Sequence, residues 1–92
     1  MVRAYQALVA MPAVGIREGD WIVYRPTAAA TFGDLIFARF RGDVVTGRLL
    51  RGAGGEHLFF DGRRGEYHPI AKSSELQVLG IVIAVRGEYA FH

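Results

Sequence analysis

The sequence contains no cysteine and a single lysine, Lys72, among its 92 residues. Without cysteine, neither a disulfide framework nor a thiolate metal site can reinforce the core. The lack of cysteine also fits the cytoplasm, where we expect the protein to reside. A chain of this length predicts one domain, residues 1–92, with a small margin of stability.

Long apolar runs are missing as well. The longest, Val78 to Val85, is far shorter than the roughly 20 residues that a membrane-spanning helix needs. The first residues do not resemble a signal peptide, because the short apolar run after Arg3 ends at a polar turn. We therefore expect no membrane attachment.

Charge of either sign is not concentrated anywhere. Lysine and arginine together number 11, aspartate and glutamate 9, and the arginines are spread from Arg3 to Arg86. This pattern excludes a polybasic tail. An arginine-rich, nearly neutral surface suits protein partners as well as phosphate groups.

Gly-Asp pairs stand before aromatic and β-branched runs. Gly19-Asp20 precedes Trp21–Arg25, and Gly33-Asp34 precedes Leu35–Arg41. Glycine can adopt the positive φ of a turn and aspartate can hydrogen-bond to nearby backbone, so each pair predicts a turn that begins a strand. A third pair, Gly42-Asp43, predicts a hairpin.

Other short apolar or alternating runs between turn residues predict further strands, at 4–11, 44–51, 56–61, 66–70 and 76–86. For 4–11 a helix is an alternative, because alanine and leucine favour it. Residues 27–32 predict a loop or one helical turn, and Gly80 predicts a bend or bulge where the last strand changes partners. The fold class is mostly β: a twisted sheet, a sandwich or a partial barrel.

Five segments carry a family pattern. They are Ala10-Met11 with Gly15-Ile16 and Gly19-Asp20, then Gly33-Asp34-Leu35-Ile36, Gly42-Asp43-Val44-Val45, Tyr67-His68-Pro69-Ile70 and Val78-Leu79-Gly80-Ile81. In this order they resemble the C-terminal Ser-Lys peptidase domain of LexA-like and UmuD-type self-cleaving repressors. The resemblance covers about residues 8–87. It implies LexA- and signal-peptidase-like twisted β-sheets that form a partial barrel.

The same resemblance places the family's catalytic serine at Ala10 and its lysine at Gly47. In that family the serine attacks a peptide carbonyl and a neutral lysine takes its proton. Alanine and glycine can do neither, and Arg48 cannot be deprotonated. Thr46 lacks a base, and Lys72-Ser73-Ser74 are too close in sequence to aim at one another. We therefore expect no peptidase activity and no cofactor.

A domain of this kind without its dyad retains one expected function, which is association. In active relatives the domain dimerises through its sheet. The resemblance thus implies a non-catalytic LexA-like domain for homodimerisation, higher homo-oligomerisation or protein binding, in repressor-type transcriptional or stress regulation. No helix-turn-helix DNA-binding domain is expected in this sequence. The interface candidates are Leu76, Val78, Ile81, Ile83, Val85, Tyr89 and Phe91.

The alternative function is a small β-barrel that binds nucleic acid. Basic residues interleaved with aromatic ones are how oligonucleotide-binding folds hold single strands. The candidates are Arg39, Arg41, Arg48, Arg63 and Arg64. A solvated face over core aromatics explains the same pattern, so direct nucleic-acid binding is not the leading expectation.

Two histidines, His57 and His68, have Asp61 and Glu66 between them. No His-X-His or His-X-X-X-His spacing supports a metal site, so none is expected. The positions predicted to lie in the core are Trp21, Phe37, Phe59 and Ile83.

Overall fold

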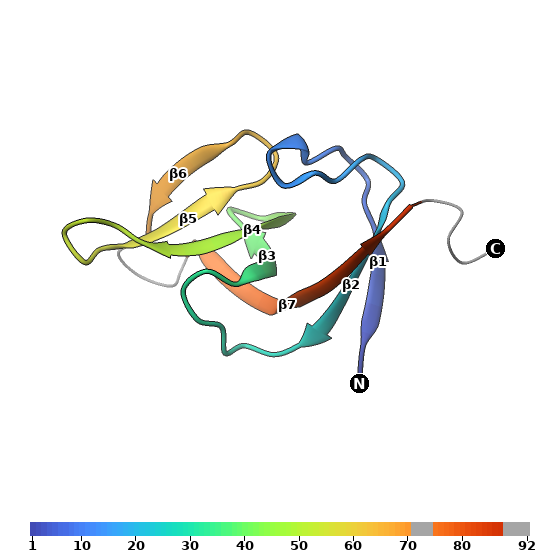
Figure 1. The fold of residues 1–92 in the computed structure, drawn as a ribbon, viewed down its shortest axis with the longest axis horizontal. Helices are drawn as coiled ribbons and strands as arrows, with labels where there is room; N and C mark the ends of the chain where they lie inside the picture. The colour runs from blue at the N-terminus through green and yellow to red at the C-terminus, as the bar shows by residue number, and fades with distance from the viewer. Residues whose placement is uncertain (71–74, 88–92) are drawn as a thin grey trace.

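The computed structural model describes residues 1–70 and 75–87, which form one antiparallel sheet of seven strands (Figure 1). The strands are β1 (Arg3–Gln6), β2 (Trp21–Pro26), β3 (Leu35–Phe40), β4 (Asp43–Arg51), β5 (His57–Asp61), β6 (Glu66–Pro69) and β7 (Leu76–Arg86). Their order in the sheet is β1-β2-β7-β3-β4-β5-β6. The mostly β prediction is confirmed. Because β1 and β6 lie at opposite edges, the sheet does not close into a barrel.

The predicted Gly-Asp turns form as expected. Gly19 and Gly33 have φ angles of 91° and 92°, which only glycine adopts easily. Asp20 Oδ2 accepts the Arg17 N–H at 2.9 Å, and Asp34 Oδ2 accepts the Thr31 N–H at 2.7 Å. Each aspartate therefore closes its own turn and fixes where the next strand starts.

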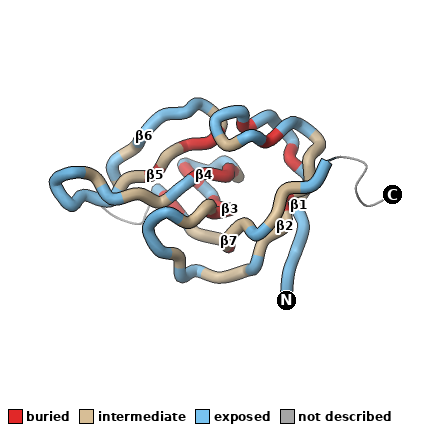
Figure 2. Tube along the Cα trace, viewed as in Figure 1, coloured by how far each residue is buried: buried red, intermediate tan, exposed pale blue. Residues whose placement is uncertain are grey.

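The strand β3 supplies side chains to two separate cores, one on each of its faces. Ile36, Ala38 and Phe40 pack with Val45, Phe59 and Leu76 in the first core. Phe37 points to the other face and packs in the second core with Ala7, Met11, Ile16 and Ile22. Figure 2 shows that the buried residues gather along the central strands and in the loop that follows β1.

The strand β7 crosses from one part of the sheet to the other. It pairs with β3 through 76–81 and with β2 through 80–86, and the register shifts once in each pairing. The predicted irregularity near Gly80 is confirmed. A Cβ at this residue would lie 2.5 Å from Tyr24 Cδ2 and 2.6 Å from the carbonyl oxygen of Arg25. The close approach of β7 to β2 at this point therefore requires glycine.

Two predictions need correction. The first strand ends at Gln6 instead of continuing to Met11, because the backbone of Ala7 already bonds to the turn at Gly19 and Asp20. Ile83 is 54% exposed rather than buried, because the register with β2 passes from Val82 to Ala84 and leaves it in a bulge.

Two of the other three residues predicted to lie in the core are buried. Phe37 and Phe59 are buried, whereas Trp21 is half-buried. The only helical element in the described part of the chain is a 3₁₀ turn, η1 (Pro12–Val14). No helix among these residues is long and apolar enough to cross a membrane.

Candidate functional site

The loop between β1 and β2 is a compact structure fastened to the sheet. Met11 and Ile16 form a β-bridge around η1, and Gly15 closes that turn with φ of 75°. At its base, the Gly19 N–H donates to Ala7 O at 2.8 Å. The loop that the family resemblance marks as the active-site segment is thus held in one conformation.

This loop lies directly against β4. Met11 Sδ is buried and accepts the Thr46 N–H at 3.1 Å. Ala13 N–H donates to Gly62 O, and Gly62 N–H donates to Thr46 O, each at 3.0 Å. The structure therefore brings together the two segments, around Ala10 and around Gly47, that the resemblance assigns to the dyad.

The chemistry at the meeting point is apolar. Ala10 is exposed and carries no nucleophile. A Cβ at Gly47 would overlap the carbonyl oxygen of Phe60 and lie 2.7 Å from the Phe59 ring. A lysine side chain cannot occupy position 47 in this packing, because β5 already fills the space.

Thr46 is the polar side chain beside this contact. It is fully buried, and its Oγ1 has no hydrogen-bond partner among the described residues. No base among the described residues lies within hydrogen-bonding distance of Oγ1, and the backbone N–H and carbonyl of Thr46 bond to Met11 Sδ and to the Gly62 N–H. Thr46 consequently lacks the proton acceptor that a nucleophilic hydroxyl needs.

A groove of about 450 Å³ opens beside the loop. Its lining is mostly apolar and comes from β1 and the loop after it, from the β3–β4 turn with the start of β4, and from the β5–β6 turn: Tyr5, Leu8, Val9, Met11, Gly42, Asp43, Val44 and Arg63. Leu8 and Val9 are exposed along it, at 73% and 49%. The sequence did not predict this groove.

A buried ion pair lies at one end of the groove. Arg63 donates to Asp61 through Nε at 3.2 Å, through Nη2 at 3.0 Å and through its backbone N–H at 2.8 Å. Its Nη1 also donates to Asp43 at 3.1 Å. Only 2% of the Asp61 side chain is exposed, compared with 70% for Asp43, so Asp61 is the partner that depends on Arg63.

The environment of Asp61 favours its charged form. Burial alone would raise the pKa of its carboxyl group, but the hydrogen bonds from Arg63 and the positive charges of Arg63 and His68 oppose burial and lower the pKa below its ordinary value. The same pair raises the pKa of Arg63, mainly through its hydrogen bonds to Asp61.

We expect this shift to make the domain sensitive to acid. Unfolded aspartate has a pKa of about 3.9. Above that value the ionised Asp61 stabilises the fold, and this contribution is lost as the pH falls through the lower pKa of the folded state. Urea unfolding from pH 7 to pH 2 should show that the stability gap between the native protein and D61N narrows below about pH 4. E18Q, at an exposed site, should track the native protein; a gap independent of pH would contradict the assignment.

The arginines proposed for nucleic-acid binding do not form one basic face. Arg41 pairs with Glu75 at 3.4 Å, Arg48 Nη1 donates to Gly33 O at 2.9 Å, and Arg63 belongs to the buried pair. Arg39 and Arg64 are exposed. A hollow of about 180 Å³ that holds three of these arginines also holds three acids: Arg41, Arg63, Arg64, Asp43, Asp61 and Glu66. A local balance of charge gives a phosphate backbone little attraction.

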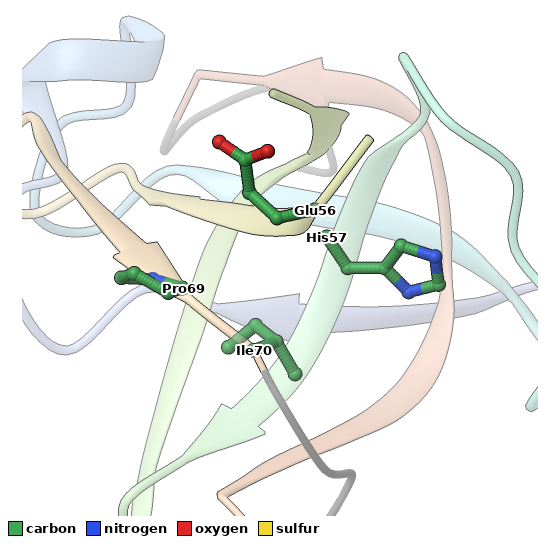
Figure 3. Close-up of a pocket in the computed structure, with 4 residues that line it drawn as sticks. All are labelled: Glu56, His57, Pro69 and Ile70. Atoms are coloured by element: carbon green, nitrogen blue, oxygen red, sulfur yellow. The ribbon is translucent and has the colours of Figure 1, made fainter. Parts of the chain in front are cut away.

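The histidines are used in aromatic packing. His57 lies edge-on to Phe32 with ring centroids 5.0 Å apart, and His68 packs on Phe40 at the same separation while its Nε2 is 3.5 Å from Glu66. In a hollow of about 330 Å³ beside β6, the Glu56 carboxylate and the His57 ring point away from one another (Figure 3). Within the described ranges, no three His, Asp or Glu residues gather closely enough to hold a metal ion.

The interface candidates on β7 fall into different environments. Leu76 and Val78 belong to the first core and Val85 to the second, so they are used within the domain. Ile81 is half-buried and Ile83 exposed. Tyr89 and Phe91 lie outside the described residues, as do Lys72, Ser73 and Ser74.

Comparison with known proteins adds no identification, since no family model and no characterised protein matches the sequence.

Proposed function

We propose that this chain is a non-catalytic, LexA-like association domain that forms homodimers through the C-terminal half of β7. The observation that carries this proposal is the pairing of that strand. β3 pairs with β7 only as far as Ile81, so Val82–Arg86 pair with β2 on one side and, among the described residues, with no strand on the other.

The strand β7 lies between β2 and β3 in the sheet, so only part of it has an open edge. The strand is interior along its first half and open only along its second. An unpaired strand edge is a template for pairing with another chain, and two copies of one strand can pair antiparallel about a two-fold axis. Ile83 bulges out of this half and is the apolar side chain that a partner would cover.

The loop that the resemblance aligns with an active-site segment supports a role without chemistry. Ala10 offers no nucleophile, and the space a lysine at position 47 would need is filled by Phe59 and Phe60. The fold combines a loop fastened to the sheet by hydrogen bonds with an open strand edge. Such a domain fits dimer formation in a cytoplasmic regulator of the repressor or stress-response type.

Sedimentation equilibrium tests the proposal. We expect the native protein to be dimeric at micromolar concentration and I83K to raise the dimer dissociation constant at least about tenfold, because two like charges would face each other across the paired strands. Y67K is the matched control, since Tyr67 is exposed to a similar extent, 61%, but lies on β6 at the far edge of the sheet. A native protein that stays monomeric at high micromolar concentration contradicts the proposal.

A further inference from the structure

One face of the β4–β5–β6 part of the sheet belongs to neither core. The ladders place Arg48 opposite Phe60 and Phe60 opposite Tyr67, so these three side chains form one row on one face. Two residues further along, a second row on the same face contains Leu50, Leu58 and Pro69. We call these six residues the aromatic face.

The aromatic face is open to solvent. Tyr67 is 61% exposed, Arg48 and Pro69 are exposed, and Leu50, Leu58 and Phe60 are only half-buried. Figure 2 shows exposed and intermediate positions along most of β6. The Phe60 and Tyr67 rings rest against each other with centroids 4.9 Å apart. A sheet face that is apolar usually packs on a second layer, and Tyr, Phe and Arg are the residues enriched where that layer is another protein.

The charge on this face indicates what kind of partner it would accept. Arg48 is its single charged residue, and its guanidinium is held in place by the Gly33 carbonyl oxygen. In the part of the chain that the structure describes, no carboxylate pairs with it. A second copy packed face to face would bring another Arg48, whereas a partner that carries an acidic side chain would pair with it.

We infer that the aromatic face binds an amphipathic helix of a partner protein, with an apolar stripe against Leu50, Leu58, Phe60 and Tyr67 and a carboxylate at Arg48. The dimensions agree, because three neighbouring strands span about 10 Å and a helix is about 10 Å across. Apart from the 3₁₀ turn η1, the described residues contain no helix that could cover this face. This surface is separate from the open edge of β7.

The test uses two synthetic helices of about 16 residues, long enough to populate helix in water. Both carry leucine at i, i+3, i+4 and i+7; one has glutamate beside the stripe and the other has lysine. In an NMR titration of the full chain, we expect the glutamate helix to shift the amide signals of Phe60 and Tyr67. It should bind about two- to fivefold more tightly than the lysine helix, the range for an exposed ion pair.

Charge reversal at Arg48 makes the test specific. R48E should reverse the preference between the two helices, whereas R39E, a reversal at an exposed arginine on β3 outside the face, should leave it unchanged. Y67K should abolish binding of both helices without affecting dimerisation. I83K should bind them as the native protein does, so failure of one proposal does not imply failure of the other.

Three results would overturn the inference. They are binding of neither helix, equal binding that R48E does not alter, and signal shifts confined to residues outside the aromatic face. Binding of a single-stranded oligonucleotide to this face, with neither helix bound, would assign it to nucleic acid instead.

Discussion

R63A is expected to lower the free energy of unfolding by about 1.5–3 kcal/mol, because it removes the charged partner that donates hydrogen bonds to the Asp61 carboxylate. Arg63 makes three hydrogen bonds to that carboxylate, and only 2% of the Asp61 side chain is exposed. Small natural domains have a total stability of about 5–15 kcal/mol, so this loss is a large part of it. Urea unfolding at pH 7 measures the change as a shift of the midpoint.

The neighbouring arginine provides the control. Arg64 is exposed and next to Arg63 in sequence, so R64A should change stability by no more than about 0.5 kcal/mol. D43A should also have a small effect, because Asp43 is 70% exposed and solvent weakens its pairing. If R63A and R64A destabilise equally, the buried pair is not what holds the β5–β6 turn in place.

The difference between Arg63 and Arg64 could not be predicted from the sequence. The run Phe60-Asp61-Gly62-Arg63-Arg64-Gly65 reads as a strand followed by a polar turn. Next to Asp61, Gly62 lets the turn come close to β4 and to the loop after β1: a Cβ at Gly62 would overlap Thr46 O and lie 2.6 Å from Val14. That contact joins three distant segments, so no local pattern reveals it.

Local chemistry did determine much of the fold. The Gly-Asp turns, the limits of β7 and the irregularity near Gly80 follow from residue types at fixed positions. Ile83 was misplaced for a related reason. An isoleucine inside the long apolar run Val78 to Val85 is expected to be buried, but the register with β2 skips Ile83, and the bulge leaves it exposed.

The sites on the surface depend on pairing between strands. Arg48, Phe60 and Tyr67 are widely separated in sequence, and only the register of β4, β5 and β6 places them in one row. The open edge of β7 likewise follows from where β3 stops pairing. Arginines lie over aromatic rings elsewhere, as Arg41 does over Phe40 and Arg51 over Phe32, but among the five candidate arginines Arg48 is the one in the row with Phe60 and Tyr67.

Introducing a lysine at position 47, where the family resemblance would place a catalytic base, is expected to unfold the domain. Even G47A should lower the free energy of unfolding by about 3 kcal/mol or more, which is the upper end of the range for overpacked cores. The reason is that the new Cβ would meet the Phe60 carbonyl oxygen and the ring of the fully buried Phe59. G47K would add an ammonium group to the same closed space, and burying an unpaired charge costs still more. The A10S/G47K double variant should therefore be unfolded by circular dichroism and show no labelling by a serine-directed phosphonate.

The control for this substitution is Gly87, where a Cβ would meet nothing within 4 Å. G87A and G87K should change the free energy of unfolding by no more than about 0.5 kcal/mol, as ordinary surface substitutions do, so the urea midpoint should stay close to that of the native protein. A stably folded G47K would show that β5 can move away from β4 and that the lysine position is still available. In the packing observed here, Phe59 and Phe60 occupy the space that a side chain at position 47 would need.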